Sequence, residues 1–151
     1  GNKITAALKV CDLVETVDSL KTAQRLVRRL EANYPGRVLP CFIEVNCSRE
    51  ASKEGINPED AWELTQQVLQ MEQLSLRGFM TIGALSPDEE RIRESFRILR
   101  DLRDRTLAAG GRGQDARELS MGMSQDLEIA ISEGATMVRI GTDVFGARDY
   151  R

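Results

Sequence analysis

Strand-like and helix-like segments alternate along almost the whole chain, and this alternation is the feature that most limits the fold. The predicted strands cover residues 13–17, 41–46, 76–82, 119–122 and 136–140. Between them apolar residues recur at helical spacing, as Ala23, Leu26 and Leu30 do at i, i+3 and i+7. The arginines off this stripe are expected to face solvent. A β-α-β-α-β-α-β-α-β order predicts a parallel sheet joined by right-handed crossovers.

Several predicted helices have recognisable start signals. Ser19 can cap the first long one. Asn57 is the expected N-cap of the next, with Pro58 at its first helical position. Residues 86–89, Ser-Pro-Asp-Glu, predict a capping box with proline at the first position of a long helix. The glycine-rich residues 108–113 then predict a flexible loop.

Two short polar turns follow the last two predicted strands. They are residues 120–124, Ser-Met-Gly-Met-Ser, and residues 139–142, Arg-Ile-Gly-Thr. Small hydroxyl and glycine residues let backbone N–H groups point at an anion, and a helix opening at Ser124 would add its N-terminus. We therefore expect the two turns to hold a phosphate group jointly. The plainer interpretation is that Ser124 only caps a helix and Gly141 only ends a strand.

Two architectures fit the alternation: an open doubly wound sheet, or a piece of a (β/α)8 barrel. A full barrel needs about 250 residues and commonly binds phosphate in the loops after strands 7 and 8. The chain has 151 residues, and its phosphate-like turns follow its last two strands. We therefore predict a single α/β domain over residues 1–151, an incomplete (β/α)8 TIM-type barrel of about five βα units equivalent to strands 4 to 8.

Composition excludes several kinds of chemistry. The chain has no histidine, which removes the usual general base, the Ser-His-Asp triad and the commonest metal ligand. Cys11, Cys41 and Cys47 have neither zinc nor disulfide spacing, which predicts a reducing, cytoplasmic setting. A net charge of −3 argues against general nucleic-acid binding, and no apolar run is long enough to span a membrane. We expect no metal site.

One long C-terminal segment carries a family resemblance. Residues 119–150, LSMGMSQDLEIAISEGATMVRIGTDVFGARDY, resemble the signature of the pyridoxal phosphate homeostasis proteins, barrels similar to the alanine racemase N-terminal domain. Positions within 44–55 resemble that family's fifth strand and loop, residues 76–82 its sixth strand, and residues 2–3 the motif after its third strand. The resemblance implies a C-terminal portion that lacks the first strands, in a protein that binds pyridoxal 5′-phosphate (PLP) and serves vitamin B6 and amino-acid homeostasis.

The resemblance also implies which residues bind the cofactor. They are Ser120, Gly122, Ser124, Arg139, Gly141 and Thr142. Arg139 would face the ring nitrogen of PLP, and the others would hold its phosphate. Because a guanidinium keeps its proton, the ring nitrogen would stay unprotonated and the ring would be a weak electron sink. The alternative for Arg139 is a structural ion pair with Glu15 or Glu44.

In this family a lysine at the end of the first strand forms a Schiff base with PLP, and that strand lies upstream of Gly1. None of the chain's four lysines matches that position, so the Schiff-base lysine is expected to be absent from this chain. Lys53 is expected to be a loop residue that pairs with a nearby carboxylate. No catalytic residue is assigned.

Three functions remain open at this point. The leading one is a PLP-binding homeostasis protein that is not an enzyme. The second is a PLP-dependent racemase-like enzyme or another barrel enzyme with a phosphate substrate; the lack of histidine, with Tyr34 and Tyr150 at a helix end and the C-terminus, counts against racemisation. The third is a truncated or engineered half-barrel without cofactor. Because unpaired strand edges associate, we expect self-association or pairing with the missing N-terminal segment.

Overall fold

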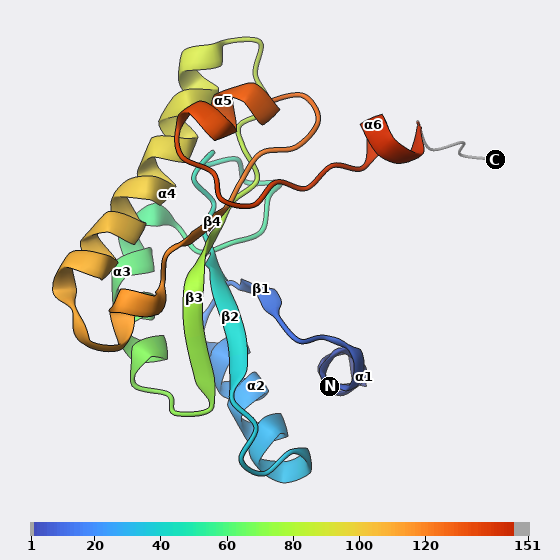
Figure 1. Cartoon of the computed structure of the whole chain (residues 1–151), viewed down its shortest axis with the longest axis vertical. Helices are drawn as coiled ribbons and strands as arrows, with labels where there is room; N and C mark the ends of the chain where they lie inside the picture. Colours follow the sequence, from blue (N-terminus) through green and yellow to red (C-terminus); the bar gives the residue numbers. More distant parts are fainter. Residues whose placement is uncertain (1, 147–151) are drawn as a thin grey trace.

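Four parallel strands form one sheet in the order β1-β2-β3-β4 in the computed structural model, which describes residues 2–146 (Figure 1). The strands are β1 (Val14–Val17), β2 (Leu39–Glu44), β3 (Leu74–Met80) and β4 (Glu118–Ser120). The helices are α1 (Asn2–Val10), α2 (Leu20–Asn33), α3 (Pro58–Leu69), α4 (Glu89–Ala109), the 3-10 helix η1 (Gly111–Asp115), α5 (Leu127–Ser132) and α6 (Thr142–Phe145). Each strand pairs with the next one along the chain, so the predicted parallel α/β fold is confirmed.

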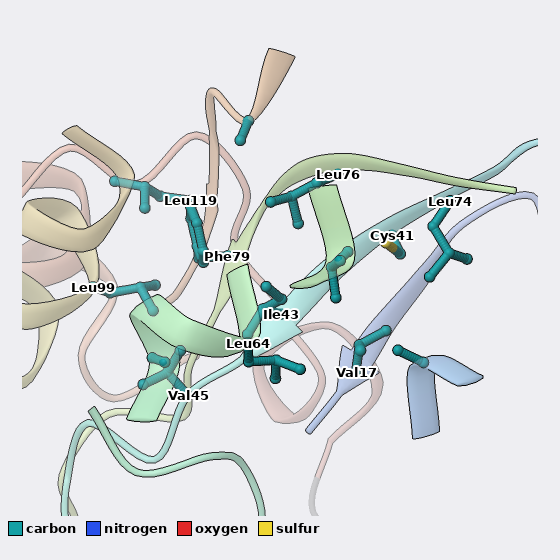
Figure 2. Close-up of a cluster of buried hydrophobic side chains, with 14 of the residues drawn as sticks. Val17, Cys41, Ile43, Val45, Leu64, Leu74, Leu76, Phe79, Leu99 and Leu119 are labelled. Carbon is teal, nitrogen blue, oxygen red and sulfur yellow. The ribbon is translucent and has the colours of Figure 1, made fainter. Parts of the chain in front are cut away.

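The two faces of the sheet have different partners. Cys41, Ile43 and Val45 belong to the apolar core that the helices cover, together with side chains such as Leu64 and Leu99 (Figure 2). Successive strand residues point to opposite faces. Phe42 and Glu44 therefore point away from that core, and both are buried. This second face therefore buries one aromatic side chain and one carboxylate, and it is distinct from the apolar core under the helices.

Two of the helix start signals place their helices correctly. Ser19 is the N-cap of α2, and its hydroxyl accepts a hydrogen bond from the Thr22 N–H at 3.2 Å. Asn57 is the N-cap of α3 and Pro58 is its first residue, although the Asn57 side chain makes no capping hydrogen bond. These signals are local, and local geometry is enough to satisfy them.

The predicted capping box over residues 86–89 is wrong in register. The Ser86 hydroxyl accepts from the Asp88 N–H at 3.1 Å, and the Asp88 carboxylate accepts from the Glu90 N–H at 3.0 Å. Asp88 is therefore the N-cap, α4 begins at Glu89, and Pro87 precedes the helix. Serine and aspartate compete for the same capping role, and here the serine stabilises the preceding turn instead.

The predicted flexible loop over residues 108–113 is also wrong. Helix α4 continues to Ala109, and η1 follows directly. The Arg112 guanidinium donates to the carbonyl oxygens of Leu69, Met71 and Leu74 at 2.8, 3.1 and 2.7 Å. These bonds fasten η1 to the end of α3 and the start of β3, so the glycines only provide the turn between two anchored helices.

The fifth predicted strand, residues 136–140, does not form a regular strand among the described residues. It makes one parallel bridge to β4, between Ser120 and Met137. The N–H groups of Thr136 and Met137 both donate to the carbonyl oxygen of Leu119, which interrupts the ladder. The segment nevertheless follows β4 closely, because the Arg139 N–H donates to the Gly122 carbonyl at 3.0 Å. It thus places Arg139 and Gly141 beside the turn after β4.

Candidate functional site

The loops at the carboxyl ends of the strands surround a cavity of about 1030 Å³. Its walls include Lys53 after β2, residues 82–86 after β3, residues 123–126 after β4, residues 139–141, and Phe145 in α6. Parallel strands bring these loops to one edge of the sheet although they lie far apart in sequence. Ligands of parallel α/β folds bind at this edge, which makes the cavity the candidate site.

Arg139 lines this cavity, and two hydrogen bonds hold its guanidinium in place. Its guanidinium donates to the Ser120 hydroxyl at 2.7 Å and to the Thr81 carbonyl at 2.9 Å. The Ser120 hydroxyl in turn donates to the Glu15 carboxylate at 2.8 Å. No carboxylate lies within ion-pair distance of Arg139 in the described residues, so the expected alternative of a direct pair with Glu15 or Glu44 is replaced by a relay through Ser120.

Burial shifts the pKa values of two charged groups on this side of the sheet, Arg139 and Glu44. It lowers the pKa of the Arg139 guanidinium, and nearby carboxylates, of which Glu15 acts most strongly, oppose that shift. Burial also raises the pKa of Glu44, which is 6% exposed, and the charge of Asp18 raises it further. Arg139 opposes the increase at Glu44. The site thus places one partly buried cation, Arg139, close to several carboxylates and in the lining of the cavity.

Ser124 has the clearest unsatisfied group in the site. Its hydroxyl oxygen is buried and has no hydrogen-bond partner, the one such side-chain atom among the described residues. Within those residues the N–H groups of Ser124, Gln125 and Gly141 also donate to no backbone carbonyl. Ser124, Gln125 and Gly141 all line the cavity. Because buried polar groups are normally paired, these donors are suited to an acceptor-rich ligand such as phosphate.

The helix that follows does not begin at Ser124 as expected. Asp126 is the N-cap of α5, and its carboxylate accepts from the Met123 N–H at 2.6 Å. This bond closes a tight turn over residues 123–126, and Ser124 in this turn lines the cavity. The expected anion site therefore rests on the turn, since the helix N-terminus lies further along the chain.

The two predicted glycines have different structural roles. Gly122 has φ +95°, and a Cβ at this position would lie 2.5 Å from the Cβ of Ala130, so only glycine lets β4 turn so close to α5. Gly141 lines the cavity, and a Cβ there would meet nothing within 4 Å. Thr142 begins α6, but its side chain lies outside the described residues. The structure thus brings Ser124, Arg139 and Gly141 to one cavity, with Ser120 and Gly122 supporting them.

Lys53 pairs with a carboxylate as expected, and its surroundings reveal residues that sequence reasoning missed. Its ammonium group donates to Glu50 at 2.9 Å and to the Gly83 carbonyl at 2.6 Å. Glu50 also accepts from the Leu85 N–H at 3.0 Å. These bonds join the loop after β2 to the loop after β3 over the cavity wall. Nothing in the sequence signals a contact between residues 30 positions apart.

Other potential chemical groups are inert or absent in the described part of the chain. Burial raises the pKa of the Cys41 and Cys47 thiols to about 12, so neither is a nucleophile at neutral pH. Residues 2–146 contain no cluster of three His, Cys, Asp or Glu side chains that could hold a metal ion. None of the helices in those residues is both long and apolar enough to cross a membrane.

A parallel sheet with helices packed on its apolar core and a cavity at the carboxyl edge of its strands defines an α/β domain of the kind that binds ligands at that edge. The family model described as "Alanine racemase, N-terminal domain" matches residues 1–149, and the chain belongs to this family. The particular relatives are pyridoxal phosphate homeostasis proteins, as the sequence resemblance indicated. The protein of that name from Pseudomonas aeruginosa is 47% identical over 150 residues, and that from Escherichia coli K12 is 40% identical. The matches cover 99% of this chain but 62% of each relative's length.

Solved structures agree with this assignment. An unknown protein from Bifidobacterium adolescentis superposes with a TM-score of 0.90 at 45% identity. The superposed part covers 95% of this chain and 56% of the Bifidobacterium chain. PipY of Synechococcus elongatus, solved with PLP bound, gives a TM-score of 0.79 at 30% identity. The superposed part covers 96% of this chain and 66% of the PipY chain. Alanine racemase of Clostridium difficile 630, in complex with cycloserine, has the same fold at 18% identity and a TM-score of 0.79. The superposed part covers 97% of this chain and 39% of the racemase chain.

Proposed function

We propose that this chain carries the phosphate cup and the ring-nitrogen contact of a PLP site, in a protein of vitamin B6 and amino-acid homeostasis. The observation that carries the proposal is the buried, unpaired hydroxyl of Ser124 in the cavity that Arg139 and Gly141 also line. The relatives named pyridoxal phosphate homeostasis proteins, and PipY with PLP bound, support it.

The residue roles follow from the donors that remain free. Ser124, Gly141 and the adjoining backbone N–H groups hold the phosphate, and the family resemblance assigns Thr142 to the same role. Gly122 permits the turn that presents Ser124. The Ser120 hydroxyl already donates to Glu15 and accepts from Arg139, so Ser120 positions Arg139 and leaves the phosphate to the others.

The proposed site is one for binding rather than catalysis. PLP when bound supplies an electron-withdrawing ring, and that capacity is greatest when its ring nitrogen is protonated. Arg139 can only donate to that nitrogen, because a guanidinium keeps its proton even where burial lowers its pKa. No histidine is available as a second base. We therefore assign the chain to the binding and homeostasis class, with neither a metal nor a nucleic acid as its ligand.

The first prediction is reversible, noncovalent PLP binding by this chain. In an absorbance titration, bound PLP is expected to be displaced by inorganic phosphate, and borohydride treatment is expected to leave no lysine of the chain modified. Intact mass before and after reduction is the measurement. A reduced lysine adduct within residues 1–151 would show that the Schiff-base lysine is present after all.

In the same assay Ser124→Ala is expected to weaken PLP binding by about tenfold, since one hydrogen bond to a charged group is lost. Ser75→Ala is the matched control, because Ser75 lies near the amino end of β3 and outside the cavity lining. Equal affinities for the two variants would remove Ser124 from the phosphate cup.

We further propose that the complete site needs additional chain, because this chain is one part of a (β/α)8 barrel in which β1 to β4 and residues 136–140 are equivalent to strands 4 to 8. The chain spans 62% of the length of its curated relatives. The outer edge of β1 has no strand partner within the described residues. Large apolar side chains at the cavity rim are exposed, with Leu85 at 80% and Phe145 at 86%. Such surface is suited to a further segment of the protein or to a second copy of the chain.

The second prediction is self-association of this chain in isolation. Sedimentation velocity is expected to show dimers or larger species at micromolar concentration. Leu85→Glu combined with Phe145→Glu is expected to shift them toward monomer, whereas Val38→Glu, an exposed apolar residue away from the cavity, is not. A well-folded monomer at all concentrations would contradict the proposed open edges.

A further inference from the structure

A second hollow lies away from the PLP cavity, between helices α1 and α2. Its volume is about 390 Å³, and its lining consists of Ile4 from α1 with Arg25, Arg28 and Arg29 from α2. The three arginines follow i, i+3 and i+4 spacing, which places them on one side of the helix. The volume of the hollow is within the range of small-molecule sites, which starts at about 300 Å³.

The charges in this hollow are not neutralised by the protein. None of the ion pairs in the described part of the chain involves Arg25, Arg28 or Arg29. The one side-chain bond among them joins the Arg28 Nε to the Gln24 carbonyl, and the other donors of the three guanidiniums face solvent. By contrast Arg93, Arg97 and Arg100 of α4 all contact a glutamate. The hollow therefore keeps guanidinium donors available.

The opposite wall of the hollow is fixed in place. Leu8 of α1 is fully buried in the core. The Arg37 guanidinium, beyond the end of α2, donates to the carbonyl oxygens of Leu8 and Cys11, each at 2.6 Å. These contacts hold the end of α1 against the segment that follows α2, and Ile4 packs against the core, so it forms an apolar wall beside the arginines.

Positive charge is also concentrated here. Helices α1 and α2 contain six cationic side chains and one acidic residue, Glu31, in a chain whose net charge is −3. The cations are Lys3, Lys9, Lys21, Arg25, Arg28 and Arg29. This excess of cations over acidic residues on α1 and α2, three of which line the hollow, favours an anionic ligand there.

We propose that this hollow binds a small molecule that carries two adjacent phosphate groups. Arginine forks match phosphate oxygens in a bidentate way, and three of them on one helix face suit more negative charge than a single phosphate supplies. Among the described residues no aromatic side chain lines the hollow, so it lacks the stacking platforms of a single-stranded nucleic-acid site. This site is separate from the PLP cavity, and it does not depend on the function proposed for that cavity.

The third prediction tests this hollow with inorganic diphosphate as the probe. In calorimetry on the full chain, diphosphate is expected to bind more tightly than orthophosphate at equal ionic strength. Arg25→Gln combined with Arg28→Gln is expected to weaken diphosphate binding at least tenfold. Arg91→Gln, an exposed arginine of α4 with no ion pair among the described residues, is the matched control and is expected to bind like the original chain.

Backbone amide shifts in an NMR titration locate the bound anion. Shifts centred on α1 and α2 support the proposal, and shifts confined to residues around Ser124 and Gly141 overturn it by placing diphosphate in the cavity. Equal affinity in the double variant and in Arg91→Gln also overturns it. So does tighter binding of a short RNA through the same two arginines, which would assign the surface to nucleic acid.

Discussion

Gly122→Ala is expected to lower the free energy of unfolding by about 3 kcal/mol. Two costs combine in this figure. Gly122 has φ +95°, where an L-residue costs about 1–2 kcal/mol. A new methyl group would also lie 2.5 Å from the Ala130 Cβ, and overpacking of this kind costs about 1–3 kcal/mol. Urea denaturation followed by circular dichroism measures the change.

Gly134→Ala is the matched control, because it separates the two costs. Gly134 has φ +94°, nearly the same backbone conformation, but a Cβ there meets nothing within 4 Å. This variant is expected to lose only the backbone cost, about 1–2 kcal/mol. If the two variants proved equally stable, the close packing of β4 against α5 would not exist as described.

The same substitution is expected to disturb the site. The Gly122 carbonyl accepts the hydrogen bond from the Arg139 N–H, and it thereby joins the two turns of the proposed phosphate cup. A shift of α5 away from Gly122 would separate Ser124 from Gly141. We therefore expect Gly122→Ala to weaken PLP binding as well, and Gly134→Ala to leave it unchanged.

The parts of the fold that the sequence predicts are those with local causes. Ser19 and Asn57 cap helices because the cap and the helix lie within four residues of each other. The parallel order of the strands follows from the alternation itself. The capping box predicted over residues 86–89 was wrong in register because Ser86 and Asp88 are both good caps. Only the hydrogen bond from the Glu90 N–H selects the aspartate.

The wrong predictions with the largest structural consequence are caused by contacts between residues that lie outside the local sequence pattern. Glycines in residues 108–113 indicate flexibility when read alone, but Arg112 bonds to carbonyl oxygens 38 to 43 residues away. Residues 136–140 have the composition of a strand, but two N–H groups share the Leu119 carbonyl and interrupt the ladder. Neither contact has a periodic signal that a sequence pattern could reveal.

Part of the candidate site could be predicted from the sequence, and part of it could not. Ser124 and Gly141 could be placed together because turns after neighbouring parallel strands meet at one edge. The relay from Glu15 through Ser120 to Arg139 could not, since it joins residues 105 and 19 positions apart. That Ser124 and Gly141 line one cavity is therefore predictable from the strand order, whereas the groups that orient Arg139 are visible only in three dimensions.

Glu133, at the end of α5, is a further residue that no sequence signal marks. Its side chain is 6% exposed and contacts Arg93 at 3.0 Å, Arg97 at 3.4 Å and Arg100 at 2.6 Å, all on α4. An acidic residue at a helix C-terminus is unfavourable for the helix dipole, so these arginines supply the compensation. They also fasten α5, and with it the turn that carries Ser124, to the longest helix.

Glu133→Gln is expected to cost about 2 kcal/mol at pH 7, because hydrogen bonds to a charged group are lost and the arginines are only partly screened. Burial by itself raises the pKa of Glu133, but the bond from Arg93 and the charges of Arg97 and Arg100 outweigh burial and lower it from 4.5. The carboxylate therefore stabilises the fold above about pH 4.5, and this contribution is lost as the pH falls through the lower folded-state pKa.

The difference in unfolding free energy between the original chain and Glu133→Gln should accordingly be largest near neutral pH and should vanish in acid. Urea denaturation at a series of pH values measures it. Glu128→Gln, at an exposed position in the first turn of the same helix, is the control and should show a much smaller difference, because its carboxylate interacts only with the helix dipole. A difference that stayed constant down to the acid limit would mean that the side chain acts through its shape, and the three arginines would then not be the reason that α5 holds its place.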